Sequence, residues 1–361
     1  MTHPHFLAHL FVRWVEFVSL VSLVGGIVYW NFVVLTIKRV VPEFKQQLLR
    51  RKLLITLLVL GVTLITDMIF RSLMMSGKPI GDLWPLLSII LLKTHSGKVF
   101  IGQGVLILLL TGFLLANHKN NMERLIDRLI LTGLSIGLCL TVSLSGHAAN
   151  RGSLQPTVLA DVIHLLAVSA WVGGLFAVRL NLSSGLSGLK EPAFSSSLRI
   201  GIQRFSMVAI LSVGALMVGG LYNTTAHVAS PELLVGTPYG RILIVKWTLI
   251  LPMLILGGLI RYGIFPLLLD LSRKTRMGFL ACVSTRFIKL FLKNPAPIDL
   301  SKWFFRMVTI EAVLGLMVLF CSAWMTQLAP PHQRSIVPVH TGHTGKYSGP
   351  HISDSSLSYN Y

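Results

Sequence analysis

Long apolar runs alternate with short polar loops along almost the whole chain. Eight of the runs approach the ~20 residues that a helix needs to cross a bilayer. A further apolar run, Leu83–Leu92, is too short to span and is predicted to be a re-entrant or interfacial segment. The pattern predicts an all-α, polytopic membrane helix bundle. Its spans are roughly Leu10–Ile37, Leu53–Phe70, Val99–Ala116, Leu129–Ser145, Val158–Val178, Phe205–Leu221, Ile242–Ile260 and Met307–Leu328.

The basic residues indicate the orientation of these spans. Most of the 32 Lys and Arg residues lie in the loops after the first, third, fifth and seventh spans. Cytoplasmic loops carry the excess of Lys and Arg, so these loops are predicted to be cytoplasmic and both termini to lie outside. The last of them, 261–306, contains an apolar and basic stretch at Phe279–Leu292. That stretch is predicted to be an interfacial helix against anionic lipid.

Short motifs recur in the two halves of the chain. The recurrence predicts two parallel four-helix repeats, and transporters often bind substrate between such repeats. Residues 1–128 would hold the first three helices, 129–157 the fourth helix and an outer loop, 158–330 the second repeat, and 331–361 a His-bearing extracytoplasmic tail. The matching residues are Thr94 and Gly97 with Thr237 and Gly240, Gly25-Gly26 with Gly173-Gly174, and Arg128 and Gly137 with Arg306 and Gly315.

Composition agrees with a membrane protein and leaves no room for a sizeable soluble domain. The 361 residues are 53% hydrophobic and only 12% charged. The net charge of +19 lies in short loops, so it indicates topology rather than nucleic-acid binding. Three cysteines without paired spacing predict neither a disulfide framework nor a zinc site. No nucleotide-binding loop, catalytic triad or HExxH motif is present, and no enzymatic activity is expected. The N-terminus has no basic start, so no cleavable signal peptide is predicted.

Two polar residues lie inside the fifth apolar run. Asp161 and His164 fall on one helix face together with Trp171. A charged side chain at mid-bilayer costs about 2.5–3.5 kcal/mol on insertion scales, and such residues usually face a bundle interior. The pair therefore predicts a polar site within the bundle. Alignment of the repeats puts Arg13 at the position of Asp161 and Glu16 at that of His164, one turn apart and able to pair.

In the predicted topology, eleven of the twelve histidines lie on the outer side of the membrane or in the outer part of a span, and His118 is the exception. Imidazole binds Cu, Zn, Ni and Fe, so one interpretation is an extracytoplasmic metal-collecting surface. The alternative is that outer loops simply hold polar residues. The outer histidines are His3, His5, His9, His95, His147, His164, His227, His332, His340, His343 and His351.

Soft ligands recur at helical spacing on the fourth and eighth spans. The fourth carries Cys139 and His147, and the eighth carries Met317, Cys321 and Met325. Thiol, thioether and imidazole groups suit Cu(I), so the two stripes could form a path inward from an outer site. The alternative is ordinary packing, because Met and Cys fit well in apolar interiors.

Three other polar groups have simpler interpretations. Asp67 and Arg71 are predicted to form a structural ion pair. Lys246 could snorkel or could balance the carboxylate of the fifth span. Glu311 could pair with Arg306, about one turn earlier on the eighth span.

Four ordered motifs resemble the CopD/PcoD-type copper-resistance membrane proteins over roughly residues 10–330. They are Ser145-Gly-His-Ala-Ala149, Asp161-x-x-His-Leu-Leu-Ala-x-x-x-Trp-x-Gly-Gly174, Thr237-x-Tyr-Gly-Arg-x-Leu-x-x-Lys246 and Arg306-x-x-x-x-Glu311. The resemblance implies a bacterial inner-membrane protein that moves copper ions from periplasm to cytoplasm beside a periplasmic copper-binding protein of the CopC type.

Within these motifs, the resemblance makes His147, Asp161 and His164 the copper-site candidates. Weaker candidates come from position and spacing alone: His95, His227, Cys139, Met317, Cys321 and Met325.

Two alternatives to copper uptake stay open at this point. One is a b-type haem protein that transfers electrons, with two membrane histidines as axial ligands. His164 is the only histidine clearly inside a predicted span, which disfavours a facing pair. The other is a copper-binding assembly or sensing protein without flux.

Overall fold

The computed structural model describes residues 3–44, 47–76, 84–117, 123–145, 156–227, 231–268 and 297–328. Every regular element in these ranges is a helix, as expected. The first half contains α1 (His3–Tyr29), η1 (Trp30–Val34), α2 (Leu35–Val40), α3 (Gln47–Ser76), α4 (Trp84–Lys93), α5 (His95–Ala116) and α6 (Leu125–Leu144). The second contains α7 (Pro156–Val168), η4 (Ser169–Gly173), α8 (Gly174–Ala177), η5 (Val178–Leu182), α9 (Ser183–Leu186), α10 (Ala193–His227), α11 (Pro231–Gly236), α12 (Pro238–Leu259), η6 (Ile260–Ile264), α13 (Phe265–Leu268) and α15 (Pro297–Met325).

These elements join into eight helices that are long and apolar enough to cross a membrane, which confirms the predicted number of spans among the described residues. The protein is a multi-pass membrane protein. The spans are Phe6–Val40, Leu49–Met74, His95–Ala116, Leu125–Leu144, Val158–Leu186, Ala193–Gly220, Pro238–Leu268 and Ile298–Met325.

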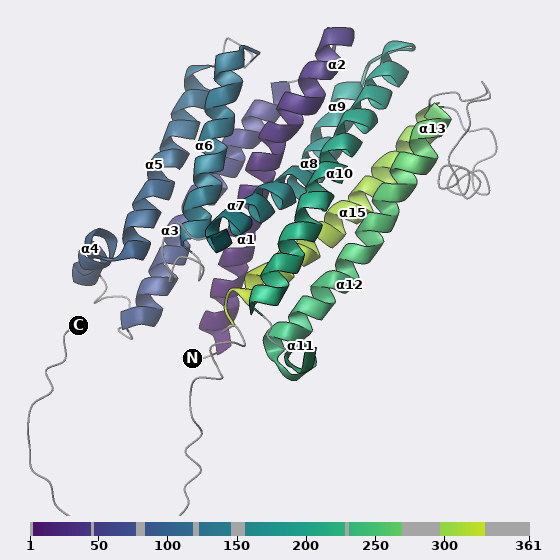
Figure 1. Cartoon of the computed structure of the whole chain (residues 1–361). Helices are drawn as coiled ribbons and strands as arrows, with labels where there is room; N and C mark the ends of the chain where they lie inside the picture. The colour runs from purple at the N-terminus through teal and green to yellow at the C-terminus, as the bar shows by residue number, and fades with distance from the viewer. Residues whose placement is uncertain are drawn as a thin grey trace, which may run out of the picture.

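The helices lie roughly side by side along one direction (Figure 1). Helix α1 begins and α15 ends at the same end of the bundle, where the short helices α4 and α11 also lie. The predicted segment Leu83–Leu92 is thus a short non-spanning helix, α4, that packs against the start of α5. The interfacial helix predicted at Phe279–Leu292 lies outside the described residues.

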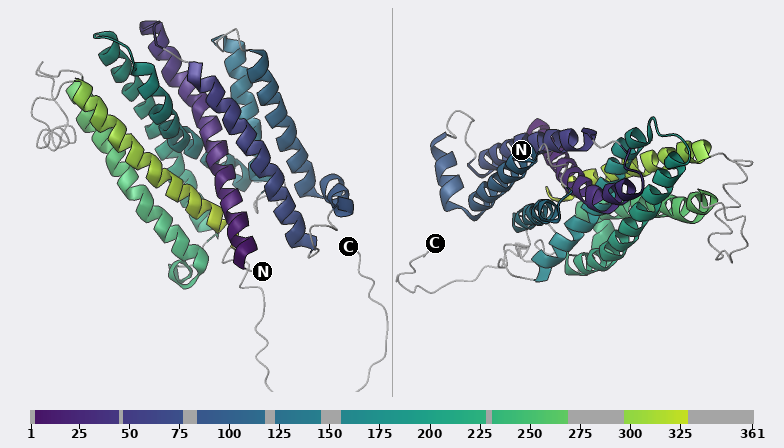
Figure 2. Two further views of the ribbon diagram at one scale, coloured as in Figure 1. Left: turned by 180° about the vertical axis from the view of Figure 1, so that it is seen from behind. Right: turned by 90° about the horizontal axis from the view of Figure 1, so that it is seen from above.

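Apolar side chains point both inward and outward, as a bilayer requires. Leu58 on α3, Leu108 on α5 and Val218 on α10 are each about 70% exposed (68%, 72% and 74%) on the outer surface of the bundle. In water such a surface would be unfavourable, whereas in lipid it faces hydrocarbon. The first span is different. In its most apolar stretch of 18 residues, 72% is buried within the protein, whereas the corresponding value for Pro238–Leu268 is 11%. Helix α1 is therefore the central helix, with α3, α5 and α6 to one side and α10, α12 and α15 to the other (Figure 2).

The repeat motifs have matching local structures. Thr94 and Thr237 both have extended backbones and cap the helices that follow them. Their hydroxyl oxygens accept hydrogen bonds from the backbone N–H groups of Gly97 (3.0 Å) and Gly240 (3.1 Å). The π-helical segments η1 and η5 begin at the same distance after the two glycine pairs. These correspondences are those expected of two repeats, and the division of the chain into two repeats stays a prediction.

The glycine pairs themselves meet where the repeats cross. Helix α1 packs against η4 and α8. A Cβ built on Gly25 would collide with the backbone of Gly173, and one built on Gly173 would collide with the carbonyl of Val21. Small residues allow two membrane helices to approach this closely. Gly25 and Gly173 therefore form one close contact between the two halves of the chain, which also meet elsewhere, as where α1 packs against α15.

Candidate functional site

The candidate residues of the second repeat lie near a junction of three helix ends. The hydroxyl of Ser143, near the end of α6, donates to the carbonyl of Val158 in the first turns of α7 (3.2 Å). The Nε2 atom of His95, at the start of α5, lies 3.3 Å from the carbonyl of Leu144. The first turns of α5 and α7 are thus hydrogen-bonded to the last turn of α6. Asp161 follows Val158 on α7 by one turn.

His164 carries a ring nitrogen that makes no hydrogen bond. The ring is largely enclosed, and its Nδ1 atom is buried without a partner among the described residues. Lys246 of α12 is close enough to interact electrostatically both with His164 and with Cys321 of α15. An imidazole, an ammonium and a thiol therefore converge here from three spans.

Asp161 faces the same helix α12 near its N-terminal end. Its carboxylate interacts electrostatically with Tyr239, which lies two turns before Lys246 on one face of α12. The sequence analysis did not select Tyr239. The i, i+7 spacing of Tyr239 and Lys246 was visible within the resemblance motif, but only the packing of α12 reveals its relation to Asp161.

The structure does not assemble all the predicted ligands. His147 lies outside the described residues, and so does the side chain of His227. Among the described residues there is no group of three or more His, Cys, Asp or Glu side chains placed to hold a metal ion. The described part of the candidate site is Asp161, His164 and Cys321, with Lys246 among them.

The two soft-ligand stripes do not face each other. Helix α6 packs against α5 and α7, whereas α15 packs against α12 and α1. Cys139 is fully buried among apolar side chains, and Met317 is 49% exposed on the outer surface. Met325 is partly exposed. Of these residues, Cys321 shares the neighbour Lys246 with His164, and the interpretation of the stripes as a shared path is not supported by their placement.

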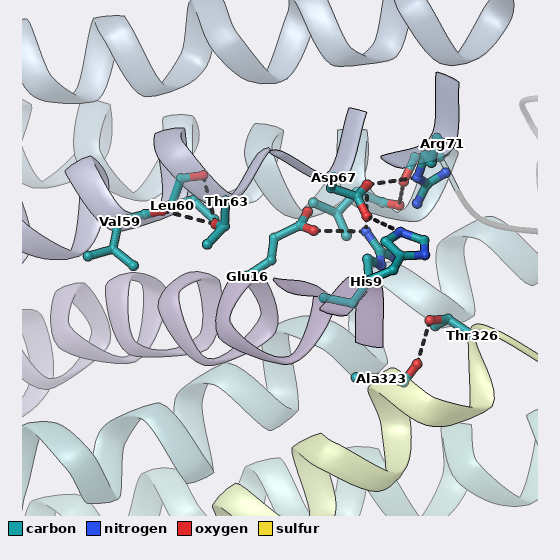
Figure 3. Close-up of polar contacts among 12 residues, drawn as sticks. His9, Glu16, Val59, Leu60, Thr63, Asp67, Arg71, Ala323 and Thr326 are labelled. Atoms are coloured by element: carbon teal, nitrogen blue, oxygen red, sulfur yellow. Dashed lines mark hydrogen bonds and ion pairs between the residues drawn. The ribbon is translucent and has the colours of Figure 1, made fainter. Parts of the chain in front are cut away.

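The corresponding region of the first repeat holds a compact charge cluster (Figure 3). Arg13 donates to Glu16 (Nη1 to Oε2, 2.9 Å), as the repeat alignment suggested. Asp67 of α3 accepts from Arg71 (2.7 Å), which confirms that predicted pair. The cluster also includes two contacts between α1 and α3, from Asp67 to His9 Nε2 (2.9 Å) and to Arg13 (3.4 Å).

His9 is a buried member that the sequence analysis placed at the edge of the first span. Helix α1 begins at His3, so His9 lies inside the helix and is only 5% exposed. The prediction that His164 alone lies within a span is therefore wrong. His9 uses its Nε2 for Asp67 and stacks against Phe70, with ring centroids 5.5 Å apart.

Glu311 has a different partner from the one suggested. It is 2% exposed and accepts a hydrogen bond from the indole Nε1 of Trp171 (3.2 Å), whereas Arg306 is exposed. The π-helical segment η4 contains Trp171 at its centre and alters the helix face on which the indole lies. Regular i, i+3 and i, i+4 spacing could not indicate this contact.

The chain is similar to copper-related proteins over most of its length. Residues 1–156 match the model of the copper resistance protein D-like N-terminal domain, and residues 201–325 match that of copper resistance protein D. The first match covers the first four spans and the second covers the last three. The span with Asp161, His164 and Trp171 lies between the two matches.

One curated relative is the copper transport protein CutJ of Bacillus subtilis (strain 168), 32% identical over 170 residues. The match covers 47% of this chain and 31% of that protein, so the chain spans less than a third of its relative. No solved structure matches. The two family matches, in order along the chain and over the eight-span bundle, place this membrane protein in the copper resistance protein D family.

Proposed function

We propose that this protein carries copper ions across the bacterial inner membrane, from periplasm to cytoplasm. The observation that carries the proposal is the buried, unbonded Nδ1 of His164, whose ring shares the neighbour Lys246 with the thiol of Cys321 from another span. A buried polar atom without a partner is costly, so its retention in a membrane bundle favours a ligand-binding role. Family membership and the name of the curated relative support copper as the ligand.

The proposed site combines donors of different softness. Imidazole and thiolate bind Cu(I) well, and His164 and Cys321 supply these two groups. Asp161 would add a carboxylate at the outer edge, and His147 would add a second imidazole from the loop after α6. The weaker candidates His95 and His227 would gather copper outside the site. We place both termini in the periplasm, on the basis of the basic loops.

Lys246 would supply a positive charge to the proposed site, and a bound copper ion would take its place as the partner of the thiolate. The metal-binding form of cysteine is the thiolate, and the ammonium of Lys246 would balance its negative charge while copper is absent. A bound copper ion would take over that role. The proposed site thus keeps a balanced charge in a place where an isolated ion would be expensive.

We also propose that copper arrives from a periplasmic copper-binding protein of the CopC type. Histidines at the outer helix ends, such as His95, would receive the ion before it reaches His164. Membrane lipid surrounds the bundle, and nucleic acid has no part in this function.

The test is copper uptake into proteoliposomes. His164→Ala and Cys321→Ala should each lower uptake strongly, because each removes a proposed ligand. Met317→Leu is the matched control, since Met317 is a soft-ligand candidate on the same helix as Cys321 but is half exposed on the outer surface. Uptake should also weaken as the outer pH falls, because protons compete with copper for imidazole nitrogen.

The outcomes separate this proposal from its alternatives. Unchanged uptake in His164→Ala would overturn it. Copper binding without uptake by the native protein would favour an assembly or sensing role, and a Soret band in the purified protein would favour haem.

A further inference from the structure

Glu311 is a carboxyl group in the middle of a membrane-spanning helix. It lies at the midpoint of α15 and is 2% exposed. Its hydrogen-bond donor is the neutral indole of Trp171, at 3.2 Å. The copper site proposed above does not use it.

The charged groups of the surrounding elements are engaged elsewhere or exposed. On α1, Arg13 and Glu16 bond to each other. On η5, Arg179 bonds to the hydroxyl of Thr309 at the exposed side of α15. No charged side chain interacts electrostatically with Glu311, and none forms an ion pair with it among the described residues.

The remaining charges near α15 lie on three elements. Lys246 of α12 is near Cys321 and His164. On η6, Arg261 stacks over Tyr262, with the guanidinium 5.9 Å from the ring centroid. Arg306 of α15 itself is exposed. Within the described part of the chain, Glu311 is therefore a buried carboxyl group without a basic partner.

The packing around Glu311 is tight. A Cβ built on Gly257 of α12 would lie 3.5 Å from Oε1 of Glu311, which is ordinary van der Waals contact. One turn along α15, a Cβ built on Gly315 would come within 2.7 Å of Val172. A metal ion with its ligands needs more room than such packing leaves. A proton adds almost no volume.

An unpaired carboxylate in an apolar interior is strongly unfavourable, and protonation removes the charge. Ionisable groups in this situation mark proton relays in membrane pumps and transporters. The position of Glu311 fits such a role. His164 and Trp171 lie two turns apart on the fifth span, and Cys321 and Glu311 lie ten residues apart on the eighth. The carboxyl group of Glu311 and the indole of Trp171 thus lie on the same two spans as the proposed copper ligands but further along them, about two turns beyond His164.

We propose that Glu311 is a proton-binding site and that its proton is exchanged as copper passes through the bundle. This inference rests on the proposed copper transport. The approaching copper ion would favour the carboxylate, so the carboxylic O–H would release its proton towards the periplasmic side, and a proton from the cytoplasmic side would bind when copper has left. The N–H of Trp171 can donate to the carboxyl group in either state. Trp171 is therefore a positioning residue.

The first test needs no transport. Infrared difference spectroscopy of the purified protein should show a carbonyl band of a protonated carboxyl group, which copper addition diminishes. Glu311→Gln should lack this band. Glu311→Asp, which keeps a carboxyl group, and Trp171→Phe, which removes the N–H donor, should each shift it. A native spectrum without the band, or a band that survives in Glu311→Gln, would overturn the proposal.

The second test measures copper and proton movement in the same proteoliposomes. Copper uptake by the native protein should raise the interior pH, and Glu311→Gln should lose this change although copper still binds at the outer site. Copper uptake without proton movement would contradict the proton exchange and leave copper transport standing. If the native protein takes up no copper, the proposed copper transport is wrong. An infrared band that copper does not change would then contradict the proposed proton binding by Glu311 as well. Size-exclusion chromatography of each variant confirms folding.

Discussion

The two predicted repeats share several local backbone features but differ in the partners of their polar residues. Both have a capping threonine, a glycine pair at the crossing and a π-helical segment at the same spacing. In the first repeat, Asp67 is bonded to His9, Arg13 and Arg71. In the second, His164 keeps an unbonded buried nitrogen. Buried nitrogens without a partner occur in both halves, because Nδ1 of His9 lacks one too, so the difference between the halves lies in the bond of His9 to Asp67 through its other ring nitrogen.

The two groups of polar residues differ in how many oppositely charged partners they contain. The first cluster has two carboxylates, two guanidiniums and one imidazole, so its charges balance when the imidazole is neutral. A buried charge is tolerated when it is paired and hydrogen-bonded. On the other side of the crossing, the described groups are an imidazole, a thiol and an ammonium, together with the carboxylate of Asp161 that interacts with Tyr239. We infer that the first repeat holds the bundle together and that the second binds the ion.

The largest expected effect on stability is in the first repeat. Asp67→Ala removes the carboxylate that bonds to His9, Arg13 and Arg71, and breaking a buried pair in this way costs about 3–5 kcal/mol. Thermal unfolding in detergent should show a clearly lowered Tm. Asp161→Ala is the matched control, because its position in the second repeat should change copper binding more than Tm. Equal losses of Tm in the two variants would contradict the division of roles.

The next effect concerns the contact between the repeats. Gly173→Ala forces a methyl group into the backbone of α1, and overpacking of this kind costs about 1–3 kcal/mol. Gly214→Ala on α10 is the control, since a Cβ there meets nothing within 4 Å. Tm should fall for the first variant and hardly change for the second. If both variants are equally stable, the glycine crossing does not hold the repeats together.

The smallest expected effects are those that the two repeats should share. Thr94→Ala and Thr237→Ala each remove a helix cap, which costs about 0.5–2 kcal/mol. Their two losses of stability should be similar, as measured by denaturation in mixed micelles. A large difference between them would mean that the duplicated caps are not equivalent.

The sequence was sufficient to predict the eight spans and the local ion pairs. Each span needs a long apolar run, so hydropathy identifies it without knowledge of its neighbours. Arg13 with Glu16 and Asp67 with Arg71 are neighbours on one helix, so spacing alone indicates them.

Contacts between helices could not be predicted in this way. The bond of His9 to Asp67 and that of Trp14 Nε1 to the carbonyl of Leu316 (3.0 Å) depend on how α1 is rotated against α3 and α15. Hydropathy does not specify that rotation. The π-helical segment η4 adds a further shift, which is why Glu311 is bonded to Trp171 and not to Arg306.

The central claim is that the second repeat binds copper through His164. Its most direct test is the amount of copper retained by purified protein under reducing conditions, compared between the native chain and His164→Ala, with Met317→Leu as control. We expect His164→Ala to retain far less copper, while Met317→Leu retains as much as the native protein. Copper retention by His164→Ala equal to that of the native protein would contradict it.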